Sequence, residues 1–145
     1  MSITINKLGV IGAGAWGTAL AKHLAEKGLE VRLWAYEHVV VNAINTSHEN
    51  SVFLKGVPLP SNLTATSSLV EAVHGCDGVL FAVPSHKTRS VLHQLAPYIS
   101  EPLPFVCATK GIEETTAKLM TQVMEDELSP SVHRSPMVLS GPSFA

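Results

Sequence analysis

The sequence predicts a doubly wound α/β fold, in which a mostly parallel sheet carries helices on both faces. Short apolar runs alternate with helical patterns along the chain, as expected when right-handed crossovers join parallel strands. A glycine-rich segment, GVIGAGAWGTAL at residues 9–20, joins the first apolar run to the first helical pattern. The chain of 145 residues, 46% hydrophobic and 15% charged, is long enough for one globular domain without cross-links. We therefore expect residues 1–145 to form a single domain.

Strands are predicted where apolar runs are bounded by turn residues. The run Gly78–Val83 is the clearest of them, and the run at residues 63–66 is the weakest. The predicted strands are Ile5–Ile11, Glu30–Trp34, Leu63–Thr66, Gly78–Val83, Pro104–Thr109 and Pro136–Ser140.

Helices are predicted from apolar spacing and from their start and stop residues. Gly28 ends the first helix, and a second continues to about Thr46. An irregular, turn-rich connection follows over residues 45–62. The remaining predicted helices are a short one at Ser68–Val73, one that Pro84-Ser85 begins and Pro97 ends, and a long one over Glu113–Leu128 with acidic residues in its first turn.

The glycines at positions 12, 14 and 17 lie where a strand would feed a helix. The first helix would direct unpaired N–H groups and the positive end of its dipole toward an anion. The interaction of the anion with the dipole stabilises it by about 0.3–1 kcal/mol, in addition to the hydrogen bonds. Gly12 permits a tight turn, Gly14 removes a Cβ that would keep a pyrophosphate from the backbone, and Gly17 allows the helix to pack closely on the strand. The segment therefore predicts a dinucleotide site, with glycines that serve packing alone as the alternative.

Recognition of the adenosine ribose is left open by the sequence. An acidic residue is expected at the end of the second strand, near Ala35, which cannot accept a hydrogen bond through its side chain. Glu37 could serve, or could be a solvated acid at a helix start. Arg32 is expected to extend from the strand edge rather than to bind a 2′-phosphate. The cofactor is therefore NAD or NADP.

Basic residues at the start of the fourth predicted helix form a second candidate site. His86, Lys87 and Arg89 would oppose the helix dipole, a cost that a nearby anion would offset. They form either a solvated basic face or a contact with a ligand. Lys110 follows the carboxyl end of a strand, where ligands gather in doubly wound sheets, and is either a ligand contact or a loop residue.

Composition excludes several classes of function. A formal net charge of −2 without a block of Lys or Arg leaves no electrostatic footprint for nucleic acid or for an anionic membrane. The 7 histidines show no metal-ligand spacing.

The sequence also bears on where the protein is found. Cys76 and Cys107 are interpreted as reduced thiols of a cytosolic protein. Glycines interrupt the N-terminal apolar stretch, so no signal peptide is expected, and no run approaches the ~20 residues of a membrane span.

Five motifs in order resemble one family over nearly the whole chain: GAGAWGTALA at 12–21, LW at 33–34, AVPS at 82–85, TKGIE at 109–113 and SGPSFA at 140–145. They resemble the NAD(P)-dependent glycerol-3-phosphate dehydrogenases. The resemblance implies an oxidoreductase that moves a hydride between C2 of sn-glycerol 3-phosphate and the nicotinamide, giving dihydroxyacetone phosphate. It also implies a cytoplasmic enzyme of glycerophospholipid synthesis and carbohydrate metabolism.

The resemblance also assigns residues. It implies substrate contacts at Lys110, Gly141 and Ser143; from position alone, the last two could equally form a turn. Tyr36 and Glu37 stand where members that prefer NADP often carry a basic residue, which puts NADP preference in doubt. The cofactor contacts that the resemblance implies are Gly12, Ala13, Gly14, Ala15, Trp16, Gly17, Tyr36, Lys110 and Ala145.

Members of this family continue into a mainly helical second domain, which supplies a proton-transfer lysine and most of the substrate pocket and through which a homodimer can form. We expect that domain to lie beyond residue 145 and to be missing, so that this fragment holds no catalytic residue. Because proton transfer and substrate orientation supply much of the rate, we expect weak cofactor binding and no measurable turnover. The alternatives are a 3-hydroxyacid dehydrogenase, a ketopantoate reductase and a non-catalytic nucleotide-binding module.

Overall fold

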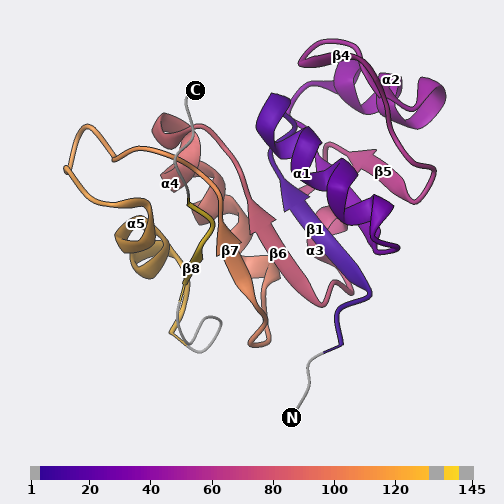
Figure 1. Ribbon diagram of the computed structural model, residues 1–145. Helices are drawn as coiled ribbons and strands as arrows, with labels where there is room; N and C mark the ends of the chain where they lie inside the picture. Colours follow the sequence, from indigo (N-terminus) through magenta and orange to yellow (C-terminus); the bar gives the residue numbers. More distant parts are fainter. Residues whose placement is uncertain (1–3, 131–135, 141–145) are drawn as a thin grey trace.

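A computed structural model of the chain describes residues 4–130 and 136–140. One sheet of six strands has the order β5-β2-β1-β6-β7-β8, and every neighbouring pair in it is parallel (Figure 1). The predicted sheet is confirmed, and each of its strands lies within its predicted bounds. The strands are β1 (Lys7–Ile11), β2 (Glu30–Trp34), β5 (Leu63–Thr66), β6 (Gly78–Phe81), β7 (Phe105–Cys107) and β8 (Met137–Val138).

Helices follow the predicted order, with one correction. The predicted helix over Glu113–Leu128 is wrong in its first half, because α5 begins only at Met120. Residues 112 and 119 instead form an isolated antiparallel bridge, and Ala117 adopts a left-handed conformation (φ 56°) that interrupts a right-handed helix. The helices are α1 (Ala15–Glu26), α2 (His38–Ser47), α3 (Leu69–Val73), α4 (Ser85–Leu95), the 3₁₀ turn η1 (Ala96–Tyr98) and α5 (Met120–Glu127).

The connection at residues 45–62 contains a small hairpin, in place of the predicted irregular segment. Its strands are β3 (Glu49–Asn50) and β4 (Leu54–Pro58), paired antiparallel. His48 ends α2 in the left-handed conformation (φ 50°) and turns the chain into β3. A strand of two residues is too short to show an alternating pattern, which is why the segment was expected to be irregular.

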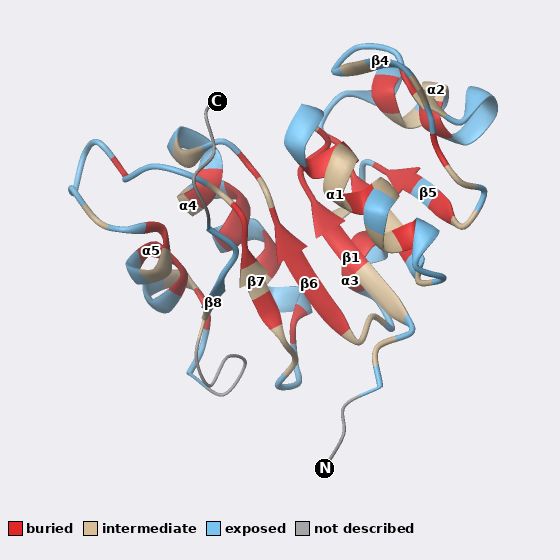
Figure 2. Ribbon diagram, viewed as in Figure 1, coloured by how far each residue is buried: buried red, intermediate tan, exposed pale blue. Residues whose placement is uncertain are grey.

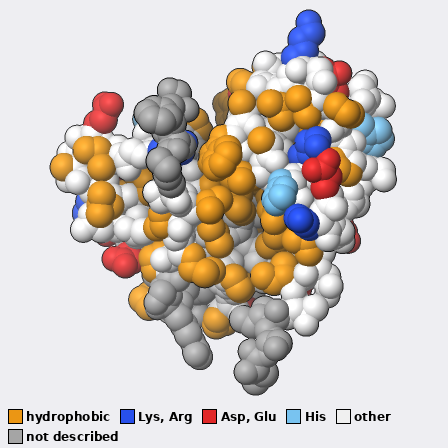
Figure 3. Space-filling model, in the orientation of Figure 1, with side chains coloured by type: hydrophobic (Ala, Val, Ile, Leu, Met, Phe, Trp, Pro, Cys, Tyr) orange, Lys and Arg blue, Asp and Glu red, His pale blue; other side chains and the backbone are white. Residues whose placement is uncertain are grey.

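Two apolar layers lie on opposite faces of the sheet. Helices α1 and α2 bury one set of side chains, which includes Ala21 and Ile44, while α3, α4 and α5 bury the other, which includes Phe81 and Leu92. The central strands are largely buried, as Figure 2 shows. In Figure 3 hydrophobic side chains form a band down the middle of the face that carries α1.

The strand order reverses at β1. The crossover through α1 leads to β2 on one side of β1, and the chain later returns through α3 to β6 on the other. Parallel sheets open a crevice at the carboxyl ends of the strands where this reversal occurs, and ligands bind there. Among the helices of the described ranges, none has the length and apolar character that a membrane span needs.

Candidate functional site: a glycine-rich loop facing a cavity

The glycine-rich loop at residues 12–17 joins β1 to the first turn of α1 and is packed so closely that two of its positions admit no side chain. Gly12 has φ +118°, and a Cβ on it would lie 2.5 Å from the Ala82 carbonyl oxygen at the end of β6. A Cβ on Gly17 would lie 1.9 Å from the carbonyl oxygen of Gly12. Gly17 therefore lets α1 approach the loop itself, a closer contact than the strand packing expected from the sequence.

Gly14 differs from these two glycines. Its φ of −66° suits any residue, and a Cβ on it would meet no heavy atom within 4 Å. It is also the N-cap of α1, whose first turn has neither a capping side chain nor an acidic residue. The unpaired N–H groups at this helix end are therefore left to an external acceptor.

A cavity of about 590 Å³ lies in front of this loop at the carboxyl edge of the sheet. Four segments enclose it: the glycine-rich loop, the end of β2 with the residues that follow it, the β3–β4 hairpin, and α4 with the two residues before it. The residues that line it are Gly12, Ala13, Gly14, Trp34, Tyr36, Glu37, Phe53, Val83, Pro84, His86, Lys87, Ser90, Val91 and Gln94.

Most of the residues predicted for the adenosine end are gathered here. Tyr36 lines the cavity with 79% of its surface exposed, which leaves its ring free to contact a ligand. Glu37 lines it too, and is at the same time the N-cap of α2, although its side chain does not cap that helix. Arg32 points elsewhere: its guanidinium donates a hydrogen bond to the Glu71 carbonyl oxygen.

Other predicted residues lie beside the cavity rather than in its lining. Ala15, Trp16 and Gly17 form the first turn of α1. The Lys110 ammonium lies 5.3 Å from the centre of the Trp16 ring, in a cation–π contact. Lys110 and the glycine-rich loop thus meet at the same edge of the sheet. Gly141, Ser143 and Ala145 lie outside the described residues.

The three basic residues of α4 separate into two groups. His86 and Lys87 line the cavity. Arg89, by contrast, is bound by carboxylates of the α5 region: its Nε lies 2.7 Å from Glu113 Oε1, its Nη1 2.7 Å from Glu127 Oε1 and its Nη2 2.9 Å from Asp126 Oδ2. The solvated basic face expected from the sequence is therefore wrong for Arg89, whose partners are carboxylates of the chain itself, while its contact with a ligand stays a prediction.

This ionic cluster fixes the loop that carries Lys110. Hydrogen bonds from Arg89 and from the Thr116 hydroxyl lower the pKa of Glu113 to about 2. The carboxylates in turn raise the pKa of Arg89. Hydrogen bonds from Lys118 and Arg89 lower the pKa of Asp126. Within the same loop, the Thr109 hydroxyl donates to the Val83 carbonyl oxygen at 2.7 Å.

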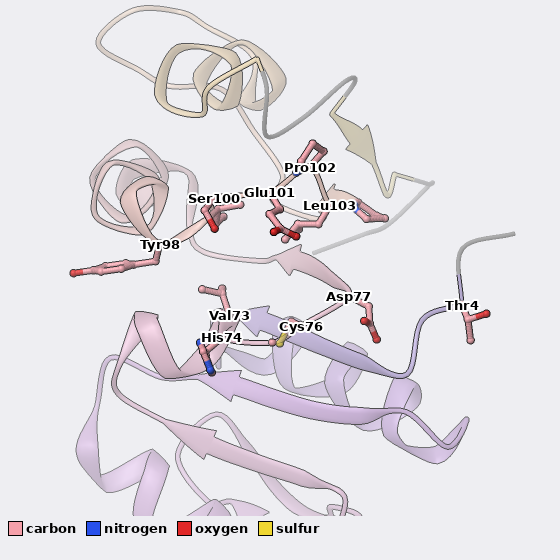
Figure 4. A pocket seen from close by; sticks show the side chains of 13 residues that line it. Thr4, Val73, His74, Cys76, Asp77, Tyr98, Ser100, Glu101, Pro102 and Leu103 are labelled. Carbon is pink, nitrogen blue, oxygen red and sulfur yellow. The ribbon is translucent and has the colours of Figure 1, made fainter. Parts of the chain in front are cut away.

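A second cavity, of about 530 Å³, lies at the opposite edge of the sheet, between the segments that lead into β6 and β7 (Figure 4). Among the described residues that line it, none begins a helix, and its glycine, Gly75 (φ +67°), follows the end of α3 instead of preceding a helix. Its Asp77 carboxylate accepts hydrogen bonds from the backbone N–H groups of Asn6 (2.8 Å) and Lys7 (2.9 Å), which lower the pKa of Asp77. This acid therefore holds the N-terminal segment against the sheet.

Cys76 and Cys107 are both free, and burial raises the pKa of each thiol. Metal-ligand clusters are absent from the described part of the chain.

Comparisons with known proteins agree with the motifs. The family model described as "NAD-dependent glycerol-3-phosphate dehydrogenase N-terminus" matches residues 7–145. The chain belongs to this family. This membership decides against the 3-hydroxyacid dehydrogenase and ketopantoate reductase alternatives as the family of the chain.

Similar proteins carry the same family name. A glycerol-3-phosphate dehydrogenase [NAD(P)+] from Parvibaculum lavamentivorans is 47% identical over 100% of this chain and 42% of its own length. One from Bacillus mycoides is 45% identical over 97% of this chain and 42% of its own length. The crystal structure of glycerol-3-phosphate dehydrogenase from Coxiella burnetii superposes with a TM-score of 0.86 at 34% identity, covering 97% of this chain and 42% of that one. The chain thus spans about two fifths of the length of these dehydrogenases.

In this member of the glycerol-3-phosphate dehydrogenase family, several residues at the cavity were not found from the sequence. Trp34 lines it from β2, where its indole N–H donates to the Ser67 carbonyl oxygen at 3.1 Å. Phe53 lines it from the hairpin, and Ser90 and Gln94 from α4. The spacing of Ser90 and Gln94 from His86 places all three on one helix face, a signal that was available in the sequence.

Proposed function

We propose that this chain is the cofactor-binding part of an enzyme that interconverts sn-glycerol 3-phosphate and dihydroxyacetone phosphate with NAD or NADP. The observation that carries the proposal is the open space above Gly14. A Cβ there would meet no protein atom within 4 Å, at the uncapped start of a helix and at the wall of a cavity of about 590 Å³. A diphosphate fits this position by charge and by size.

The lining residues suit the rest of a dinucleotide. In our proposal the N–H groups at the start of α1 bind the pyrophosphate, Tyr36 lies against the adenine, and Glu37 accepts hydrogen bonds from the ribose. A carboxylate at Glu37 would repel a 2′-phosphate, so we expect NAD to bind more tightly than NADP. The nicotinamide, when bound, accepts or supplies the hydride.

Lys110 is proposed to contact both substrate and cofactor. Its loop follows β7 at the carboxyl edge of the sheet, and its ammonium already lies beside the first turn of α1 through Trp16. A cation at this place would attract the phosphate or the developing alkoxide of a glycerol phosphate. Gly141 and Ser143 are proposed to add substrate contacts, and Ala145 a contact with the nicotinamide.

A second domain is proposed to complete the active site. The curated relatives are more than twice as long as this chain, because it covers 42% of each. Part of the described surface also suits such a partner, since Met137 and Val138 of the edge strand β8 are 45% and 55% exposed. We propose that a mainly helical domain holding the proton-transfer residue and dimer contacts packs here, and that the enzyme acts in the cytoplasm, where two free thiols remain reduced.

Cofactor binding is tested by titrating the chain with NADH and NADPH, followed by calorimetry or by energy transfer from tryptophan. NADH should bind, and more tightly than NADPH. Gly14→Val should weaken NADH binding by at least about tenfold, since its side chain fills the space for the pyrophosphate. The variant should remain folded, with its unfolding midpoint lowered by a few degrees at most, because that space is empty of protein and the only cost is a less favourable helix N-cap. A folded Gly14→Val variant that binds NADH like the wild type would refute the proposal.

Activity is tested by joining the chain to the remaining residues of the Parvibaculum relative and assaying with glycerol 3-phosphate. The joined protein should reduce NAD, whereas the 145-residue chain alone should show no measurable turnover. Turnover by the chain alone would contradict the proposed need for a second domain. A joined protein that binds NADH without reducing NAD would favour the non-catalytic nucleotide-binding module.

A further inference from the structure

A fully buried amide connects the β3–β4 hairpin to the glycine-rich loop. Asn50 has 0% of its surface exposed, and its Nδ2 donates to the Ala13 carbonyl oxygen at 2.9 Å and to the Thr18 hydroxyl at 2.8 Å. Its Oδ1 accepts the backbone N–H of Phe53 at 3.0 Å. Because a backbone N–H can only donate, the Phe53 contact assigns the oxygen and nitrogen of this amide without ambiguity.

The carbonyl group that Asn50 binds belongs to the peptide between Ala13 and Gly14. This carbonyl oxygen accepts two hydrogen bonds, one from Asn50 and one from the Thr18 hydroxyl at 3.2 Å. In a planar trans peptide the C=O and the following N–H point in opposite directions. Holding the Ala13 carbonyl toward the buried side therefore directs the Gly14 N–H away from it, toward the open side where a Cβ of Gly14 would meet nothing.

Asn50 and Thr18 do not contribute equally to this arrangement. Thr18 lies on α1 itself, five residues after Ala13, so it moves together with the loop that it binds. Asn50 lies 37 residues away and belongs to another element, which also contributes Phe53 to the cavity wall. It is therefore Asn50 that fixes the peptide relative to the rest of the site.

We propose that Asn50 is a positioning residue for dinucleotide binding, which aims the Gly14 N–H at the pyrophosphate. This inference rests on the proposed function, because it names a residue that organises the same site. The inference also gives the β3–β4 hairpin a role. The hairpin places the buried amide of Asn50 against the turn that is proposed to bind the pyrophosphate.

The test compares two ligands that differ in the group Asn50 is proposed to serve. Wild-type chain and Asn50→Ala are titrated with ADP, which carries a pyrophosphate, and with adenosine, which carries none. Asn50→Ala should lose about tenfold or more in ADP affinity, the range expected for a hydrogen bond to a charged group, and less than about twofold in adenosine affinity. Thr18→Val should change ADP affinity in the same direction by a smaller factor.

Asn62 provides a matched control. Its amide also donates two hydrogen bonds to backbone carbonyl oxygens, those of Ala25 (2.7 Å) and Leu29 (2.8 Å), at the far end of α1. Asn62→Ala should lower the unfolding midpoint while leaving the ratio of ADP to adenosine affinity unchanged. An Asn50→Ala variant that binds ADP like the wild type, or that loses both ligands equally, would overturn the inference.

A second measurement keeps the inference testable without a ligand. The ¹H–¹⁵N signal of Gly14 should shift and broaden in Asn50→Ala and Thr18→Val, whereas that of Gly28, beyond the other end of α1, should not. An unchanged Gly14 signal would overturn the positioning role. If the wild-type chain binds neither NADH nor ADP while the Gly14 signal responds as expected, the proposed function fails and the structural part of this inference stands.

Discussion

Two loops meet at the carboxyl edge of the sheet, and different kinds of interaction hold them. The glycine-rich loop at residues 12–17 is fixed by uncharged, buried hydrogen bonds from Thr18 and Asn50. The loop at residues 108–119, which carries Lys110, is fixed by charged groups: the partly exposed Arg89 binds the buried Glu113 and two acids of α5. They meet where the Lys110 ammonium lies over Trp16.

The difference concerns how each loop responds to its surroundings. Buried hydrogen bonds between neutral groups do not titrate and are not screened by salt, whereas ion pairs near the surface are weakened by salt and by protonation of the carboxylates. We therefore expect the glycine-rich loop to keep its shape over a wide range of conditions. The Lys110 loop should loosen in acid or in high salt.

The largest effect is expected from a side chain inside the glycine-rich loop. Gly17→Ala places a Cβ 1.9 Å from the backbone oxygen of Gly12, which cannot move without displacing β1, so the free energy of unfolding should fall by about 3 kcal/mol. Gly14→Ala is the control, and it should cost less than about 1 kcal/mol because its Cβ enters open space and only the preference of the N-cap for glycine is lost. Urea denaturation of both variants checks this, and equal stabilities would show that the loop is not rigid.

Removing the charge at the centre of the other loop should have the next largest effect. Arg89→Met leaves the three carboxylates of Glu113, Asp126 and Glu127 without their shared partner, so the melting temperature should fall by several degrees. The difference from the wild type should shrink on raising NaCl to about 0.5 M, since salt screens exposed pairs. Arg32→Met should cost less, because this guanidinium donates to the Glu71 carbonyl oxygen and is not shared by three carboxylates. A salt-independent difference would mean that Arg89 acts through packing alone.

Acid should act on the Lys110 loop through Glu113. The pKa of this carboxyl is about 2 in the folded protein, below its ordinary value of 4.5, so the folded state binds fewer protons than the unfolded chain in this range. The contribution of Glu113 to stability is therefore complete above about pH 4.5 and is lost as the pH falls toward 2. Urea denaturation at pH 6 to 2.5 should show a steeper loss for the wild type than for Glu113→Gln, and parallel profiles would contradict the assigned pKa.

The smallest effect is expected where the two loops touch. Lys110→Met removes the cation over Trp16, at a cost of about 0.5–1 kcal/mol or less because the ring is exposed at the surface. Tryptophan emission should nevertheless change, since a charge next to an indole alters its fluorescence. Lys27→Met, at the other end of α1, should leave emission unchanged. Identical spectra for Lys110→Met and the wild type would place the ammonium away from the ring in solution.

Local sequence patterns predicted the sheet because each of them depends on residues that are close in the chain. The run Gly78–Val83 is apolar enough to identify a buried strand. The spacing of Gly12, Gly14 and Gly17 and their place between a strand and a helix identify the turn that we propose binds a pyrophosphate. The prediction of a helix over Glu113–Leu128 failed in its first half, where the spacing suits a helix but Glu113 is held by Arg89 from α4 and the chain turns back at Ala117. The local sequence around Glu113 does not indicate this contact, because α4 and residue 113 become neighbours only in the folded chain.

The sequence by itself thus determined the parallel α/β order, the position of the glycine turn and the edge of the sheet where ligands gather, because these follow from periodicity and from conformational freedom at single residues. Only the tertiary structure decided which partners hold the site: Asn50 reaches Ala13 across 37 residues, and Arg89 reaches Glu113 across 24. The type of a polar residue tells from the sequence which hydrogen bonds it can donate or accept. Its partner depends on how distant elements pack together, and the local sequence of one element does not specify which other element it packs against.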